Sequence, residues 1–139
     1  RTDKRVARQR WGEQRMKGAY AWRTLIDQGN VLPNGSDSPV ENFNPFVGMY
    51  CAVARKDETG EPAEGFYPHE AMTREEALRS FTCWPAYAAF EEHLKGSIEQ
   101  GKLADFIVID RDIMPCSEDE IKDIQVLETV IGGETVYTK

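Results

Sequence analysis

The hydrophobic pattern of the chain changes at Ser97, and this change constrains the fold more than any other feature. From there on, apolar residues gather in short segments typical of β-strands, at residue 98 and over residues 104–109, 126–131 and 135–137. Gly132-Gly133 separates the last two segments and suits a type I′ hairpin loop, because glycine adopts a positive φ without steric cost. The sequence therefore predicts strands at the C-terminal end and, before them, helices and loops.

The segment before residue 30 predicts a helix. Residues 2–28 are rich in helix-forming side chains and lack proline, and Gly29 follows as a stop signal. Gly12 is expected to divide this helix in two. Residues 30–34 are partly apolar but contain a proline, so they predict at most a short strand, which would end in the turn-rich loop 35–39.

Further helices are predicted from capping signals. Thr73 and Glu76 form a capping box, in which each side chain bonds the backbone amide of the other residue. Pro85 is expected to kink this helix or to begin a second one that continues to Lys95. Three shorter segments complete the pattern: a helix over residues 46–53 after Asn44-Pro45, a loop over residues 56–68, and a helical turn over residues 118–123.

Size and charge exclude several classes of protein. A chain of 139 residues is too short for a complete eight-stranded α/β barrel, which needs roughly 200 residues or more. No apolar segment approaches the ~20 residues of a membrane-spanning helix, so no membrane contact is expected. Residues 1–23 hold eight basic and two acidic residues, whereas the remainder holds nine basic and twenty-two acidic ones. With a net charge of −7, nucleic-acid binding is not expected, and the basic segment is interpreted as a solvated helix face.

Cysteine and histidine also limit the chemistry. The three cysteines are widely spaced and form no C-x-x-C pair: Cys51, Cys83 and Cys116. This pattern favours reduced thiols and a cytoplasmic location over a disulfide framework. His69 and His93 are the only imidazoles and are expected at the surface rather than as metal ligands. The acidic runs at residues 91–92 and 118–120 are interpreted as solvated charge.

Asp37 is the one residue whose context suggests chemistry. It follows a short apolar segment and lies in a tight loop between Ser36 and Ser38, where a carboxylate can ligate a metal or act as a general base. The same sequence suits an Asx-turn, in which the carboxylate bonds backbone amides ahead of Pro39. The residues by themselves leave both interpretations open.

Several segments resemble a known family. Residues 96–110, Gly-Ser-Ile-Glu-Gln-Gly-Lys-Leu-Ala-Asp-Phe-Ile-Val-Ile-Asp, resemble the G-S-I-x-x-G-K-x-A-D-x-V-V-L-D signature near the C-terminus of the metal-dependent amidohydrolase superfamily. Residues 73–88 and 129–137 resemble its amidohydrolase 3 branch in particular. Residues 34–41 resemble the G-S-D-x-P motif that follows the last barrel strand in that branch. The resemblance extends over about residues 15–139.

The resemblance implies an α/β fold that is part of a larger one. Residues 1–95 would supply the last helices and strand of a distorted (β/α)8 barrel, and residues 96–139 would supply strands of a small β-sandwich. The parent protein would use one or two divalent metals, usually zinc, to hydrolyse C–N bonds of small amide-type substrates other than peptides. Asp37 would be both a metal ligand and the catalytic carboxylate that takes a proton from the attacking water.

The chain lacks most of the residues that this chemistry needs. The metal-binding histidines of the family and its bridging lysine or glutamate have no counterpart here. Because a stable zinc site requires three or four ligands, the isolated chain is expected to hold no metal and to be inactive. The sandwich strands would lack their partners and expose their edges, which predicts a homo-oligomer. The alternative is a non-catalytic structural or interaction module derived from the same family.

Overall fold

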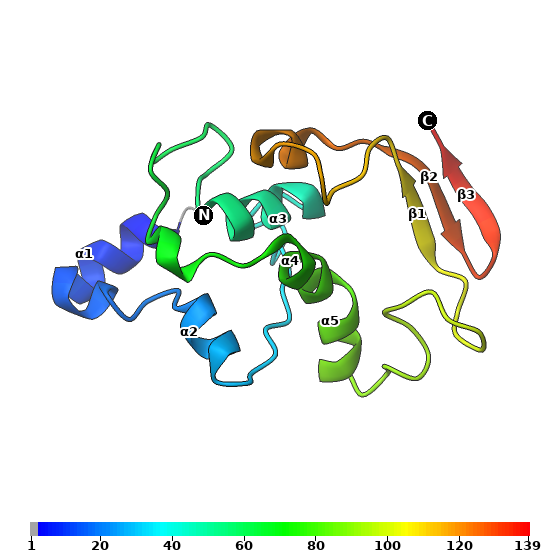
Figure 1. Cartoon of the computed structure of the whole chain (residues 1–139), viewed down its shortest axis with the longest axis horizontal. Helices are drawn as coiled ribbons and strands as arrows, with labels where there is room; N and C mark the ends of the chain where they lie inside the picture. Colours follow the sequence, from blue (N-terminus) through cyan, green and yellow to red (C-terminus); the bar gives the residue numbers. More distant parts are fainter. Residues whose placement is uncertain (1–2) are drawn as a thin grey trace.

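The computed structural model describes residues 3–139, in which helices and loops lead into a small antiparallel sheet. Figure 1 shows α1 (Asp3–Met16) and α2 (Trp22–Asp27) at one end of the molecule and the sheet at the other. The strands therefore follow the helices, as the change of pattern at Ser97 predicts.

The N-terminal helical segment is divided by glycine. Gly12 interrupts α1 with φ 73° and ψ 164°, which confirms the predicted division. α2 ends before Gly29, whose φ is 86°. The amides of Gly29 and Asn30 donate to the carbonyls of Ile26 and Leu25, respectively, so a Schellman motif ends the helix at the predicted place.

α3 (Pro45–Ala54) lies at the centre of the hydrophobic core. The Asn44 side chain caps it by accepting a hydrogen bond from the Phe46 amide (3.0 Å). Tyr50 is fully buried and donates its hydroxyl hydrogen to Asp119 (3.0 Å). Glu120 accepts from the Ser117 amide (2.8 Å), so the acidic run 118–120 is not only solvated charge, as predicted, but also has structural partners. The buried residues of this core come from both halves of the chain: Phe46, Met49, Tyr50, Ala52, Ala54, Met72, Ala77, Ile113, Ile121 and Ile124.

The capped helix begins as predicted, but the helix after it is shorter than predicted. η1 (Pro68–Glu70), α4 (Arg74–Phe81) and α5 (Cys83–Ala88) follow the loop after α3, and both bonds of the Thr73–Glu76 capping box are present. α5 does not continue to Lys95, because Phe90 takes a left-handed conformation with φ 60° and completes a Schellman motif. Glycine is usual at that position, so the sequence carries no stop signal there.

The C-terminal strands form one antiparallel sheet in the order β1-β2-β3. β1 (Phe106–Ile109) is followed by η2 (Glu118–Asp123), β2 (Val126–Ile131) and β3 (Glu134–Thr138). Both glycines of the predicted hairpin loop, Gly132 and Gly133, have positive φ. Residue 98 lies outside the strands, in contrast to the prediction.

Few side chains of the C-terminal sheet are buried by the rest of the described chain. Val130 is its only buried residue among the described positions, whereas apolar side chains remain exposed along all three strands: Phe106, Ile107, Val108, Leu127, Ile131, Val136 and Tyr137. β1 and β3 each have one edge without a strand partner in this sheet. None of the described helices combines the length and hydrophobicity that a bilayer-spanning helix needs.

Residues 30–34 do not form a strand. They run in an irregular conformation between α2 and the Asp37 loop, and within the described part of the chain no strand pairs with them. A strand requires a neighbour that accepts and donates its backbone hydrogen bonds. The prediction of a short strand is therefore wrong for this chain.

Candidate functional site

Asp37 lies in an exposed turn between α2 and α3. Its φ is 50°, in the left-handed region that aspartate tolerates better than most residues. The Asp37 carbonyl accepts a hydrogen bond from the Val40 amide (2.9 Å), and the Ser36 hydroxyl accepts one from the Ser38 amide (3.3 Å). No described residue donates to the Asp37 carboxylate, so the Asx-turn interpretation is wrong and Ser36 makes the local side-chain turn.

The segment that carries Asp37 is attached to α4. The Asn34 amide donates to the Ser80 carbonyl (2.8 Å), close to the C-terminal end of that helix. Ser80 is fully buried, and its hydroxyl donates to the Ala77 carbonyl (2.7 Å). The last carbonyls of a helix have no partner within the helix, so the Asn34 amide satisfies one of them. This bond fixes the backbone three residues before Asp37.

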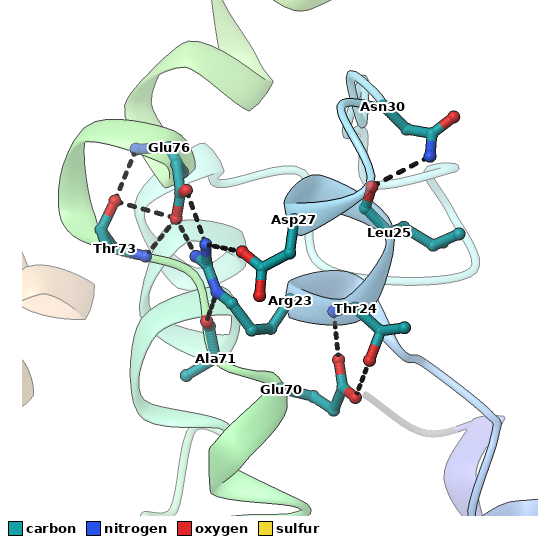
Figure 2. A network of polar contacts seen from close by, with 9 residues as sticks. All are labelled: Arg23, Thr24, Leu25, Asp27, Asn30, Glu70, Ala71, Thr73 and Glu76. Carbon is teal, nitrogen blue, oxygen red and sulfur yellow. Dashed lines mark hydrogen bonds and ion pairs between the residues drawn. The ribbon is translucent and has the colours of Figure 1, made fainter.

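The helix before the Asp37 loop is attached to the other end of α4 (Figure 2). The Arg23 guanidinium of α2 meets the Glu76 carboxylate with both terminal nitrogens; Nη1 lies 2.9 Å from Oε1, and Nη2 donates to Oε2. Arg23 also donates to the Ala71 carbonyl (3.3 Å) and to Asp27 (3.2 Å). The hydrogen bond from Arg23 holds the pKa of Glu76 at about 2, although burial acts in the opposite direction and bonds from Thr73 assist.

A second polar contact joins α2 to η1 (Figure 2). The amide and the hydroxyl of Thr24 donate to the two oxygens of Glu70, at 2.9 and 2.5 Å. Glu70 is buried. Burial acts to raise the pKa of this carboxyl, but the bonds from Thr24 hold the pKa below its usual value. A buried carboxylate with two donors is thereby satisfied without a full ion pair.

Arg55 is a buried arginine next to α2. It is only 5% exposed, and burial lowers the pKa of its guanidinium. The guanidinium donates to the carbonyls of Phe66 (2.9 Å) and Tyr20 (3.1 Å) and lies 4.3 Å from the centre of the Trp22 ring. These contacts tie the start of α2 to the end of α3.

The described residues do not fit a complete metal centre. A catalytic zinc site needs three protein ligands and an open position. In the part of the chain that the structure describes, no group of three or more His, Cys, Asp or Glu side chains is arranged to hold a metal ion. His69 and His93 are exposed, as predicted, and Asp37 contributes a single carboxylate. Two surface hollows, of about 510 and 90 Å³, do not include Asp37 in their lining.

Comparison with known proteins assigns the chain to a family. A family model described as the amidohydrolase family matches residues 3–137, nearly the whole chain. The chain belongs to the amidohydrolase family. The match includes the Asp37 loop and all but the last residue of the C-terminal sheet, so the resemblance seen in the sequence is confirmed.

Sequence relatives of this amidohydrolase chain come from bacteria and a plant. N-substituted formamide deformylase of Arthrobacter pascens is 39% identical over 84% of this chain and 21% of its own length. YtcJ of Bacillus subtilis (strain 168), which carries an amidohydrolase name, is 34% identical over 94% of this chain and 25% of its own length. LONG AFTER FAR-RED 3 of Arabidopsis thaliana is 35% identical over 95% of this chain and 22% of its own length. The chain thus spans about a quarter or less of these relatives.

A solved structure has the same fold over most of the chain. An amidohydrolase from Thermotoga maritima MSB8 matches with a TM-score of 0.64 and 21% identity. The match covers 86% of this chain and 26% of the other one. The arrangement of helices and small sheet therefore occurs within a larger amidohydrolase structure.

The sequence motif indicates Asp37 but none of the contacts that hold its loop. Arg23 and Glu76 are 53 positions apart, and Thr24 and Glu70 are 46 apart. The capping box assigns Glu76 a local role, and nothing in its spacing indicates a distant arginine as a further partner. Only the folded arrangement brings α2 and α4 together.

Proposed function

We propose that this chain is the C-terminal part of a metal-dependent amidohydrolase that hydrolyses non-peptide C–N bonds. The observation that carries the proposal is the family match over residues 3–137, which includes the loop of Asp37. Asp37 is the proposed catalytic carboxylate. Its exposed position, without a donor among the described residues, leaves it accessible to groups supplied by the rest of a larger protein.

We further propose that the whole protein binds a divalent metal, with zinc the first candidate, and that Asp37 is one of its ligands. The remaining ligands would come from outside this chain, because its described residues do not assemble three of them. For the same reason the chain alone is proposed to be inactive. An ionised aspartate has the chemistry for a further role, since it can accept a proton from water and return it to a leaving amine.

The proposed architecture follows from the same assignment. Residues 1–95 would belong to the C-terminal part of a (β/α)8 barrel, and residues 96–139 to a small β-sandwich. The match to about a quarter of a larger amidohydrolase structure supports a partial fold. The buried core, which draws on residues on both sides of the boundary, would then join the two parts.

The partners proposed for the protein are a small amide-type substrate and further copies of the same chain. The substrate class is supported by the relative whose name gives N-substituted formamides as its substrates. The exposed apolar side chains and open edges of the sheet support self-association of the isolated chain. None of the three cysteines, all within the described residues, forms a disulfide, which supports a cytoplasmic location.

The test compares the whole protein with the isolated chain. Both are assayed on N-substituted formamides, simple amides and ureas, and the metal content of each is measured by elemental analysis. We expect turnover and bound metal in the whole protein and neither in the chain. Stoichiometric, tightly bound zinc in the chain would contradict the proposed division of ligands. A whole protein without hydrolytic activity on the entire panel would favour a non-catalytic module.

A further inference from the structure

We propose that Arg23 and Glu76 are positioning residues for Asp37, because their ion pair fixes the helix before the Asp37 loop against the helix that anchors this loop. The proposal rests on the function proposed above for Asp37. It assigns a role to a contact that joins two distant parts of the chain, α2 and α4 (Figure 2).

α2 is held in place mainly by polar contacts. It has only six residues and buries none of them completely, although Trp22 and Ile26 pack against the edge of the core. An isolated helix of this length is unstable in water. Its position therefore depends strongly on its polar contacts, which Arg23 makes to Glu76 and Thr24 makes to Glu70.

Glu76 has two separable tasks. Its Oε2 accepts a hydrogen bond from the Thr73 amide (2.7 Å), which caps α4, and both carboxylate oxygens accept bonds from Arg23. The first task needs only an acceptor, and glutamine also serves at this position of a capping box. The second task, pairing with Arg23, needs a charged carboxylate that accepts from the guanidinium with both oxygens. Glu76→Gln therefore removes the ion pair while it leaves the cap largely in place.

α4 holds the chain on both sides of the segment that leads to Asp37. Arg23 is attached at its N-terminal end through Glu76, and Asn34 at its C-terminal end through the Ser80 carbonyl. Between these points Leu32 packs against the core. If the first attachment is released, α2 keeps its contact with Glu70 but loses its ion pair with α4, so the segment that leads to Asp37 is held less firmly. The consequence is a displaced Asp37 carboxylate, although neither Arg23 nor Glu76 is proposed to touch the substrate.

The same helix offers a matched control. Glu75 precedes Glu76 and, among the described residues, pairs with Arg79 alone on the exposed face of α4, at 2.8 Å. Glu75→Gln makes the same chemical change one position away without releasing α2. A general effect of lost negative charge on α4 would appear in both variants, whereas a positioning effect appears in Glu76→Gln alone.

The test uses the whole protein and four variants: Asp37→Asn, Glu76→Gln, the double variant and Glu75→Gln. Hydrogen exchange by mass spectrometry follows the peptide that covers residues 30–40, and steady-state kinetics give kcat and KM. We expect exchange of this peptide to rise about 10-fold in Glu76→Gln and kcat to fall about 10-fold or more, since small misplacements of catalytic groups carry large rate penalties. KM should change less than about 2-fold, and Glu75→Gln should behave like the wild type.

The Asp37→Asn background separates positioning from general damage. If Glu76 acts through Asp37, adding Glu76→Gln to Asp37→Asn lowers the residual turnover no further. An equal loss in both backgrounds, or unchanged exchange of the 30–40 peptide in Glu76→Gln, would overturn the positioning role. Wild-type turnover of the Asp37→Asn variant would instead overturn the proposed function, whatever the exchange experiment gives.

Discussion

Replacing Glu76 by glutamine should destabilise the chain at neutral pH and have little effect at pH 2. The pKa of Glu76 is about 2, against an ordinary value of 4.5, chiefly because Arg23 donates to the carboxylate. A carboxyl whose pKa is lowered by folding stabilises the fold above its unfolded-state pKa, and this contribution is lost as the pH falls through the folded-state pKa. The stabilisation by Glu76 should therefore disappear between about pH 4.5 and pH 2.

The structure also sets the size of the effect. Each pH unit between the two pKa values corresponds to about 1.36 kcal/mol, so the upper limit is about 3 kcal/mol. The side chains of Arg23 and Glu76 remain 25% and 19% exposed, and screening by solvent reduces the expected contribution to about 1–2 kcal/mol.

Urea unfolding of the wild type, Glu76→Gln and Glu75→Gln over pH 2 to 7 measures this contribution. At pH 7 the Glu76→Gln variant should have a free energy of unfolding about 1–2 kcal/mol below that of the wild type, and this difference should shrink to a few tenths at pH 2. Glu75→Gln should stay within about 0.5 kcal/mol throughout, as expected for an exposed pair. A destabilisation of Glu76→Gln that does not vary with pH would refute the ion-pair explanation, because it would not follow the ionisation of the Glu76 carboxyl.

Two further predictions concern the core and a glycine turn. Tyr50→Phe should lower the free energy of unfolding by about 1 kcal/mol, because a buried hydroxyl loses its bond to Asp119; an unchanged urea midpoint would contradict this. Gly96→Ala should destabilise the chain by at least about 1 kcal/mol more than Gly101→Ala in thermal unfolding. Both glycines have similar φ, 96° and 94°, but only at Gly96 would the new methyl group lie 2.7 Å from the Ala86 Cβ. Equal losses at the two sites would show that backbone strain, not crowding, dominates.

Local signals in the sequence predict local structure well. The capping box at Thr73, the stop at Gly29 and the hairpin glycines 132–133 are all confirmed, because each depends on residues within one or two turns of the chain. The predicted end of the last helix, at Lys95, lies beyond the observed end of α5 at Ala88. Phe90 has a left-handed conformation at a position where helices usually have glycine, so the sequence does not indicate this end. The strand over residues 30–34 is predicted but does not form, because a strand depends on a neighbour and not on its own sequence.

The candidate site likewise has one part that the sequence predicts and one part that it does not. Asp37 is visible in the sequence through its loop motif, whereas the contacts that hold this loop join residues far apart. The Asn34–Ser80 bond and the Arg23–Glu76 pair depend on how α2 and the segment after it lie relative to α4, which no short sequence motif indicates. Buried Arg55 is a comparable case, because a lone arginine at the end of an apolar helix gives no sign that two distant carbonyls and a tryptophan ring surround it.

The role of Asp37 is tested most directly by the turnover of the whole protein with Asp37→Asn, measured together with its metal content and its far-ultraviolet circular dichroism. We expect a fold and a metal content close to those of the wild type, with turnover reduced by about 100-fold or more, as is usual when a general base is removed. Turnover close to the wild-type value in a correctly folded variant would show that Asp37 is not the catalytic carboxylate.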